Sequence, residues 1–210
     1  MHTLARLAIL IVFAITSAAV AQSIRNVGGC SVRPGTICAN MNLRGIDLSN
    51  ANLRHSQFTR SVLAGANLSG ANLDESNLSS TDLRSADLSS TLLRKVNARA
   101  ARFDEANLSG AKLNNAVLQS SNLSGANAAN ADLSGAKLAN ARLQGAQFQG
   151  TNLQRANLRG GRLERASLVG AKLEGANFTD ADLRGADLSG AGIEHAVFTR
   201  AQTAGCKGCP

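Results

Sequence analysis

The stretch SGANLDESNLSSTDLRSADLSSTLLRKV, residues 69–96, places leucines at positions 73, 78, 83, 88 and 93. Leucine therefore recurs every five residues. An α-helix does not use this spacing, because five residues turn it by about 500° and successive leucines would circle the helix. A flat strand does not use it either, because an odd spacing sends alternate leucines to opposite faces. A chain that turns a corner every five residues would bring every leucine to one shared interior.

The same spacing continues through most of the chain. From Leu43 to Phe198 every fifth residue is large and apolar, except for Ala98 and Ala128. The residue two positions before each of these centres is small, most often alanine, and the residue directly before it is often Asn or Asp. Four sides of five residues make a square coil of 20 residues, and stacked coils form a solenoid.

Units such as ANLSG (66–70), AKLEG (171–175) and ADLRG (181–185) closely resemble the repeat of pentapeptide-repeat proteins, whose consensus is A(N/D)LxX. This resemblance implies an all-β fold, a right-handed quadrilateral β-helix. About eight coils of 20 residues would be stacked in a rod, at roughly 4.8 Å per layer. The centre and the small residue two positions before it would point inward.

The N-terminal 21 residues are typical of an export signal. Arg6 precedes an apolar core from Leu7 to Ile15, and Ala19-Val20-Ala21 fits an A-x-A cleavage site. The alternative, an uncleaved anchor, is disfavoured because the apolar core is too short to span a bilayer. We therefore expect export to the periplasm or the cell exterior, with no transmembrane segment after cleavage. The expected organisation is a signal peptide (1–21), an N-terminal segment and cap (22–35), a β-helix (36–200) and a C-terminal cap with the C-x-x-C motif (201–210).

Cys30, Cys38, Cys206 and Cys209 lie outside the leucine array, one pair at each end. An even number of cysteines in an exported chain favours disulfides, and a Cys30–Cys38 bond would tie the chain over the first coil. The spacing of Cys206 and Cys209 leaves three interpretations open: a structural disulfide, a metal or redox role, and pairing with another chain. The redox interpretation expects the motif to open a helix, and here it follows the repeats directly.

The outward residues give each wall of the coil its own composition. The basic wall, centred on Phe58, Leu78 and Ala98, carries one acidic residue, Asp180, and five basic residues: Arg60, Arg99, Lys137, Arg159 and Arg200. It is the candidate anion-binding wall, for an anionic polymer or membrane surface. Charges spread over eight coils are more typical of a plain solvated face than of a dedicated anion site. The absence of interleaved aromatic residues disfavours nucleic acid as a partner.

The other three walls show weaker signals. The serine wall, centred on Leu48, Leu68 and Leu88, presents a file of serines and no basic residue. Ice-binding or glycan-binding solenoids have such files, and the repeat consensus alone also produces them. The first mixed wall, centred on Leu43 and Leu63, and the second mixed wall, centred on Leu53 and Leu73, carry both charge signs, as ordinary solvated surfaces do.

The sequence contains no constellation of catalytic residues. His55 and His195 fall on the same wall but seven coils apart, about 34 Å, so they cannot share a metal or a proton relay. We expect no enzymatic activity, no cofactor and no metal. The favoured function is a non-enzymatic exported scaffold that binds a protein or an anionic envelope surface, and a homodimer through one coil end is a candidate assembly.

Two alternatives belong to other functional classes. Some pentapeptide-repeat proteins resemble duplex DNA, bind DNA gyrase and confer quinolone resistance, and the resemblance extends that function to this chain as an alternative. It requires an acidic rod, whereas the coils carry 18 basic and 14 acidic residues, 18 − 14 = +4. The export signal also opposes it. The second alternative is a thiol redox protein that uses Cys206 and Cys209.

Overall fold

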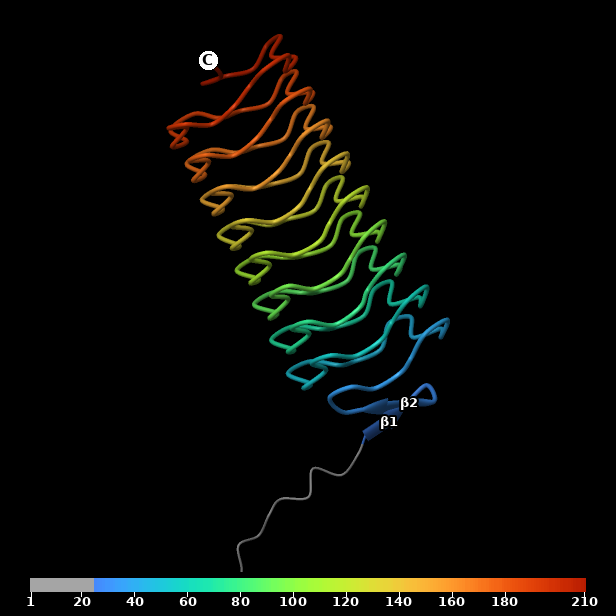
Figure 1. Cartoon of the computed structure of the whole chain (residues 1–210). Coiled ribbons are helices and arrows are strands. Elements are labelled where there is room, and N and C mark those ends of the chain that lie inside the picture. Colours follow the sequence, from blue (N-terminus) through green and yellow to red (C-terminus); the bar gives the residue numbers. More distant parts are fainter. Residues whose placement is uncertain (1–24) are drawn as a thin grey trace, which may run out of the picture.

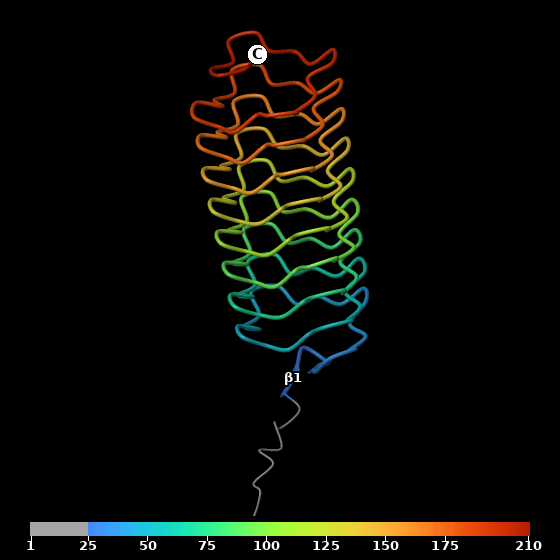
Figure 2. The same cartoon turned by 60° about the vertical axis from the view of Figure 1, so that its left-hand side comes forward.

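The computed structural model describes residues 25–210, so the predicted signal peptide lies outside the described residues. The chain winds into a stack of similar coils that forms a rod (Figure 1). The coils stay aligned along the rod when it is viewed from another side (Figure 2). Parallel β-bridges join each paired residue to the one 20 positions later, from Ile37–Gln57 to Asp187–Lys207. The predicted repeat β-helix is therefore confirmed.

Each side of a coil ends in a tight turn. The main-chain N–H of the small inward residue donates to the carbonyl of the preceding centre, as from Ala51 to Leu48 at 3.1 Å. The second residue after each centre has a positive φ, from Asn40 to Gly205. This geometry is that of a type II turn, which favours Gly or Asn at the positive φ. Other residues, such as Ala100 with φ 54°, adopt it because hydrogen bonds between coils fix the backbone.

The interior of the rod is filled along its length. Every centre from Leu43 to Leu188, including the alanines at 98 and 128, is at most 2% exposed. Several buried threonine hydroxyls donate to carbonyls of the coil before them. Thr81 donates to the carbonyl of Phe58 and Thr151 to the carbonyl of Ala128, both at 2.7 Å. The rod therefore has no internal channel at these layers, and contacts with other molecules are left to its walls and ends.

A hairpin covers the N-terminal end. Its strands β1 (Arg25–Val27) and β2 (Cys30–Val32) are antiparallel and joined by Gly28-Gly29. Both glycines have positive φ, 60° and 82°, as a type I′ turn requires. A Cβ on Gly28 would lie 2.9 Å from the Leu43 side chain, so the turn rests on the first coil. The buried Cys30 is disulfide-bonded to Cys38, with the two Cα atoms 5.5 Å apart.

The C-terminal end is built differently from the expected cap at 201–210. Residues 201–207 extend the ladder beyond residue 200, with bridges Asp182–Gln202 and Asp187–Lys207. They continue the coil because the main-chain N–H groups of Gln202 and Lys207 each find a carbonyl of the preceding coil at 2.9 Å. Only residues 208–210 lie beyond the ladder. A disulfide joins Cys206 to Cys209 there, with the Cα atoms 5.8 Å apart.

Candidate interaction surfaces

Within residues 25–210, no group of three or more His, Cys, Asp or Glu side chains is placed to hold a metal ion. That part of the chain also contains no helix long and apolar enough to cross a membrane. His55 lies beside Glu75, with Nδ1 3.7 Å from Oε2. His195 lies on the same wall seven coils further on, so the structure does not bring the two histidines together. The surfaces that remain for function are the outer walls and the ends.

The basic wall does not form one compact site. Arg159 and Arg200 converge on Asp180, whose carboxylate lies 3.5 Å and 2.6 Å from their Nε atoms. The hydrogen bond from Arg200 is the main reason that the pKa of Asp180 is lowered. Arg60, Arg99 and Lys137 make no ion pair with any of residues 25–210. Successive members of this trio are two coils, about 10 Å, apart along the rod.

The second mixed wall holds an ion pair whose carboxylate is nearly buried. Asp74 is 3% exposed and accepts hydrogen bonds from the guanidinium of Arg94 in the next coil. The main-chain N–H of Arg94 also donates to it at 2.9 Å. Burial by itself raises the pKa of Asp74, but the Arg94 donors and the charge of Arg54 outweigh it and hold the pKa below its usual value. The pair therefore locks two neighbouring coils together and offers no free charge to a partner.

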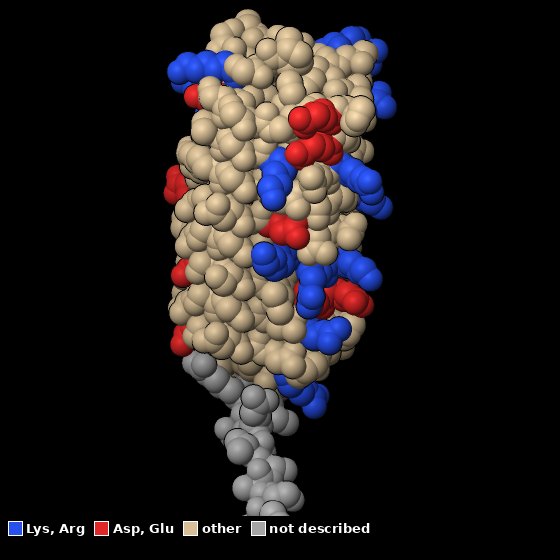
Figure 3. Space-filling view, turned by 90° about the vertical axis from the view of Figure 1, so that its left-hand side faces the viewer, with Lys and Arg blue, Asp and Glu red and all other residues tan. Residues whose placement is uncertain are grey.

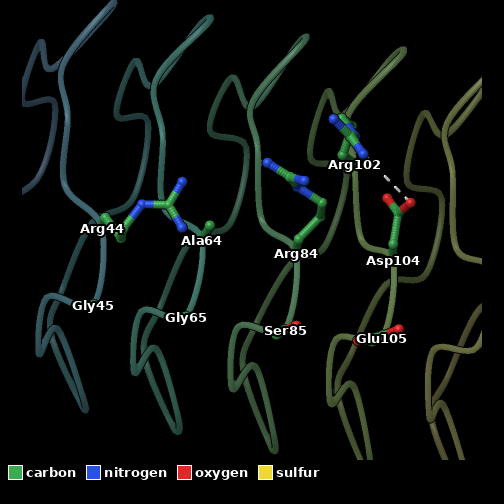
Figure 4. Close-up of a pocket in the computed structure, with 9 residues that line it drawn as sticks. All are labelled: Arg44, Gly45, Ala64, Gly65, Arg84, Ser85, Arg102, Asp104 and Glu105. Atoms are coloured by element: carbon green, nitrogen blue, oxygen red, sulfur yellow. Dashed lines mark ion pairs between the residues drawn. The ribbon is translucent and has the colours of Figure 1, made fainter.

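The first mixed wall contains an open cleft of about 670 Å³ between two arginines. At Ala64-Gly65 the wall lacks long side chains, while Arg44 lies one coil before and Arg84 one coil after. Figure 4 shows the Arg44 side chain extending toward Ala64, while the Arg84 side chain rises over its own coil on the other side of the gap. Ala64 is 4% exposed although it is an outward residue. We call this feature the arginine cleft; its charged lining is Arg44, Arg84, Arg102, Asp104 and Glu105.

The arginines of the cleft differ in their existing partners. Arg84 forms two parallel hydrogen bonds to Asp82, of 2.8 Å and 2.6 Å, and these lower the pKa of that carboxyl. Arg102 lies 3.6 Å from Asp104. The guanidinium of Arg44 makes no ion pair or hydrogen bond with residues 25–210. Two like charges facing one gap, one of them unpaired, favour an oxyanion between them.

Sequence reasoning treated this wall as an ordinary solvated surface and missed the cleft. The sequence did contain a signal for the cleft. Ala64, which precedes Gly65, has an arginine 20 residues before it and another 20 residues after it. Figure 3 shows why charge counts alone concealed such features: on the face in view, both signs gather along one side and the rest carries few charges. Opposite charges lie close to each other there, so a count taken over a whole wall hides a local imbalance.

The C-terminal cysteines stand at the end of a coil. Both are partly buried against the core, and Gly208 packs so closely on the preceding coil that a Cβ would lie 2.8 Å from the Leu188 carbonyl oxygen. The motif does not open a helix in the structure. This setting is that of a disulfide which closes the last turn of a rod.

Comparisons with known proteins agree with this geometry. A family model described as pentapeptide repeats, in eight copies, matches residues 42–79, 81–119, 121–160 and 162–200. The solved structure of HetL, a pentapeptide-repeat protein involved in heterocyst differentiation regulation in the cyanobacterium Nostoc sp., is similar at 27% identity and TM-score 0.51. It aligns over 81% of this chain and 88% of its own. A comparison with curated proteins gave no match.

QnrB1, a plasmid-mediated fluoroquinolone resistance protein, has a similar fold with TM-score 0.61. Its identity is 17%, over 79% of this chain and 90% of its own. The likeness to QnrB1 concerns the fold alone. The family model, by contrast, covers most of the coils described above, and it matches the units that form their sides. The chain belongs to the pentapeptide-repeat family.

Proposed function

We propose that the chain is a non-enzymatic exported scaffold that binds a macromolecular partner through its outer walls. The observation that carries this proposal is the filled interior, in which every centre from Leu43 to Leu188 is buried. A filled convex rod offers no enclosed pocket in which reacting groups would converge. It does offer long rigid walls on which side chains repeat at a fixed spacing. HetL, which is involved in the regulation of heterocyst differentiation, provides a family precedent for a function of this kind.

The arginine cleft is the docking point that we assign to the partner. Arg44 supplies an unpaired guanidinium, and Arg84 adds a second one already held in place by Asp82. Asp104 and Glu105 stand beside the cleft and would repel a dense polyanion such as nucleic acid. A single carboxylate on a protein surface of mixed charge fits better, because its neighbours can meet these acidic residues with basic ones. The proposed partner is therefore a protein that presents a carboxylate.

Export is the second part of the proposal. It rests on the Arg6-led apolar segment and the Ala19-Val20-Ala21 site. Two disulfides in the structure suit an oxidising compartment. Mass spectrometry of the protein from cell fractions tests this part: we expect an N-terminus at Gln22 in an extracytoplasmic fraction. An intact Met1 in the cytosol would contradict it.

The binding part is tested by crosslinking in native envelope fractions, followed by a pull-down. The wild type is compared with Arg44→Ala and with the control Arg142→Ala, an exposed arginine on the same wall without an ion pair to residues 25–210. We expect the wild type and the control to capture the same protein and Arg44→Ala to lose at least tenfold of it. Equal capture by all three would remove the cleft as the docking point, and no specific capture by any of them would overturn the scaffold proposal.

The gyrase alternative is tested separately with a DNA supercoiling assay. The basic excess of the coils, 18 against 14, is opposite in sign to a DNA mimic, so we expect no inhibition or protection of gyrase at micromolar protein. Either effect would favour that alternative over a docking scaffold. For the thiol redox alternative, a disulfide-reductase assay with Cys206→Ser as control is expected to show no activity above background.

A further inference from the structure

One side of the rod has no acidic residue over six consecutive coils. This acid-free face is the part of the basic wall formed by the outward residues within 57–60, 77–80, 97–100, 117–120, 137–140 and 157–160. It carries four cations, Arg60, Arg99, Lys137 and Arg159, and all four are exposed. Asp180, the acidic residue of the basic wall, follows only in the next coil. The face therefore has a formal charge of +4.

Three of these cations are not neutralised within residues 25–210. The side chains of Arg60, Arg99 and Lys137 make neither an ion pair nor a hydrogen bond in that part of the chain. Arg159 lies 3.5 Å from Asp180, but its side chain is still 63% exposed. The charges of the acid-free face are therefore available to another molecule.

The acid-free face is straight and held on a continuous ladder. Parallel bridges join the coils beneath it, from Gln57–Asn77 to Lys137–Asn157, and the coils stay aligned in both views of the rod (Figures 1 and 2). The face extends over about 24 Å at roughly 4.8 Å per coil. Its cations are separated mostly by short, uncharged side chains: Thr59, Ser79, Ser80, Ala100, Ser120 and Ala139. All four cations can therefore contact one flat surface at the same time.

The opposite side of the rod carries the opposite charge. The walls follow one another along the chain in the order first mixed, serine, second mixed and basic, so the serine wall lies across the rod from the basic wall. The outward residues of the serine wall between 47 and 190 include Asp47, Asp87 and Asp187 and no basic residue. An anionic surface would attract the acid-free face and repel the serine wall, and this difference orients the rod.

The spacing of the cations indicates which kind of anion fits. Successive members of the trio of Arg60, Arg99 and Lys137 are about 10 Å apart along the rod, too far to bind one small anion together. A nucleic-acid strand carries a phosphate about every 3.4 Å, and most of its charges would stay unneutralised. A protein interface has an apolar core, whereas the apolar outward residues of this face are Val117 and two alanines, at 100 and 139.

A bilayer with anionic headgroups fits these features. Lipids move laterally and can gather beneath cations at any fixed spacing, and a flat membrane surface requires neither a pocket nor an apolar core. Its negative potential attracts each Lys or Arg within a Debye length, roughly 10 Å, and each such cation strengthens binding about fivefold. We propose that the rod lies on an anionic membrane surface through the acid-free face, with the serine wall turned away. This proposal does not depend on the proposed function.

Vesicle binding tests the proposal. The full oxidised protein is sedimented at about 0.1 M salt with vesicles of phosphatidylglycerol and phosphatidylcholine in equal amounts, or of phosphatidylcholine alone. We expect the wild type to bind the anionic vesicles alone and to release them as the salt concentration rises. The triple variant Arg60→Gln, Arg99→Gln, Lys137→Gln should bind about a hundredfold more weakly, because it lacks three cations worth about fivefold each.

A second triple variant controls for net charge. Lys112→Gln, Arg142→Gln and Lys172→Gln remove three exposed cations of the mixed walls that make no ion pair with residues 25–210. Its net charge equals that of the first triple variant, and its loss of binding should be less than about fivefold, the effect of one cation at the surface. Arg44→Ala, which tests the arginine cleft, should leave vesicle binding unchanged, so the two proposals can fail separately.

Two matched serines test the orientation of the rod. Ser79 lies on the acid-free face and Ser69 on the serine wall, and each hydroxyl donates to the Asn side chain two residues before it, at 2.6 Å and 2.7 Å. A polarity-sensitive dye attached to Ser79→Cys should shift its emission to shorter wavelength when anionic vesicles are added. The same dye on Ser69→Cys should show no shift, because that wall faces away from the membrane.

Several outcomes would overturn the proposal. These are a wild type that does not bind anionic vesicles, equal binding to neutral vesicles, equal losses in the two triple variants, and equal shifts of the two dyes. Soluble dextran sulfate is the probe for an anionic polymer. If the acid-free face bound dextran sulfate but not vesicles, its partner would be a polymer and not a membrane. Unchanged circular dichroism of the variants confirms that they are folded.

Discussion

Each end of the rod is the edge of a coil, and the two ends differ in how much of that edge is covered. At the N-terminal end a hairpin and the Cys30–Cys38 disulfide cover the first coil, and Leu43 is 2% exposed. Toward the C-terminal end residues 201–207 continue the ladder, and Phe198 is only partly buried. A repeat stack needs protection at both ends, because each end has apolar interior and unpaired backbone. The difference teaches that, within residues 25–210, a hairpin and a disulfide bury the interior at one end, whereas the interior at the other end stays partly exposed.

Removing the protection from each end gives the largest expected contrast. Deletion of residues 25–34, with Cys38→Ser, uncovers the first centres and removes a disulfide, which we expect to lower the free energy of unfolding by roughly 5 kcal/mol. Deletion of residues 208–210, with Cys206→Ser, should cost less than about 2 kcal/mol, because the end is already open. Urea unfolding of both proteins measures the difference. Equal losses would show that the two ends are protected alike.

The stacked phenylalanines compare a buried layer with the exposed layer above it. Phe178→Ala is expected to lower the free energy of unfolding by about 3–5 kcal/mol, because Phe178 is fully buried. Phe198→Ala removes a ring with one open face, and we expect about 1–2 kcal/mol. Thermal unfolding measures both. A loss for Phe198→Ala as large as for Phe178→Ala would mean that the terminal ring is covered.

Two glycines are expected to reverse the order, with the larger loss of stability at the C-terminal end. In Gly208→Ala the added Cβ would meet backbone atoms of Leu188 at 2.8 Å and 2.9 Å, with φ at +70°. In Gly28→Ala, with φ at +60°, its one close contact would be the tip of the Leu43 side chain, at 2.9 Å, which can move. We expect a loss of about 2–3 kcal/mol for Gly208→Ala and about 1 kcal/mol for Gly28→Ala. Denaturation midpoints that rank the two variants the other way would contradict this close packing.

Acid stability compares carboxylates near the two ends and gives the smallest effect. Arg94 donors, against the opposing effect of burial, lower the pKa of Asp74, and the hydrogen bond from Arg200 lowers that of Asp180. A lowered folded-state pKa contributes stability above the usual value of 3.8, and this is lost as the pH falls below it. Asp74→Asn should therefore flatten the loss of stability in acid more than Asp180→Asn, whose carboxyl is more exposed. Unfolding midpoints between about pH 5 and pH 2 measure this. Equal flattening would mean that the two ion pairs contribute equally to the stability that is lost in acid.

The fold was predictable because one rule, five residues per side, constrains every position at once. It placed the centres from Leu43 to Leu188 inside and identified both disulfide pairs as features of the ends. The path of the C-terminal tail was not predicted, because its in-phase centres are Thr203 and Gly208 and not large apolar residues. Its main-chain hydrogen bonds nevertheless keep the offset of the other coils.

The walls were less predictable than the interior. Ion pairs between neighbouring coils follow the 20-residue offset, as Asp74–Arg94 and Asp180–Arg200 do, and such pairs can be found by aligning the coils. The arginine cleft depends in addition on the directions that Arg44 and Arg84 take over the gap at Ala64. Side-chain direction on an exposed wall is not fixed by spacing, so total charge gave no indication of the cleft.

Because each residue pairs with the one 20 positions later, deletions of different lengths have different effects on the rod. Loss of five residues in the middle would leave the interior sealed, since every unit supplies the same inward pair. It would also rotate everything beyond that point by a quarter turn and move each outer column onto the neighbouring wall. Loss of 20 residues would only shorten the rod. Evolution can therefore change the length of this protein in whole coils and exchange its surfaces in single units, while its interior stays the same.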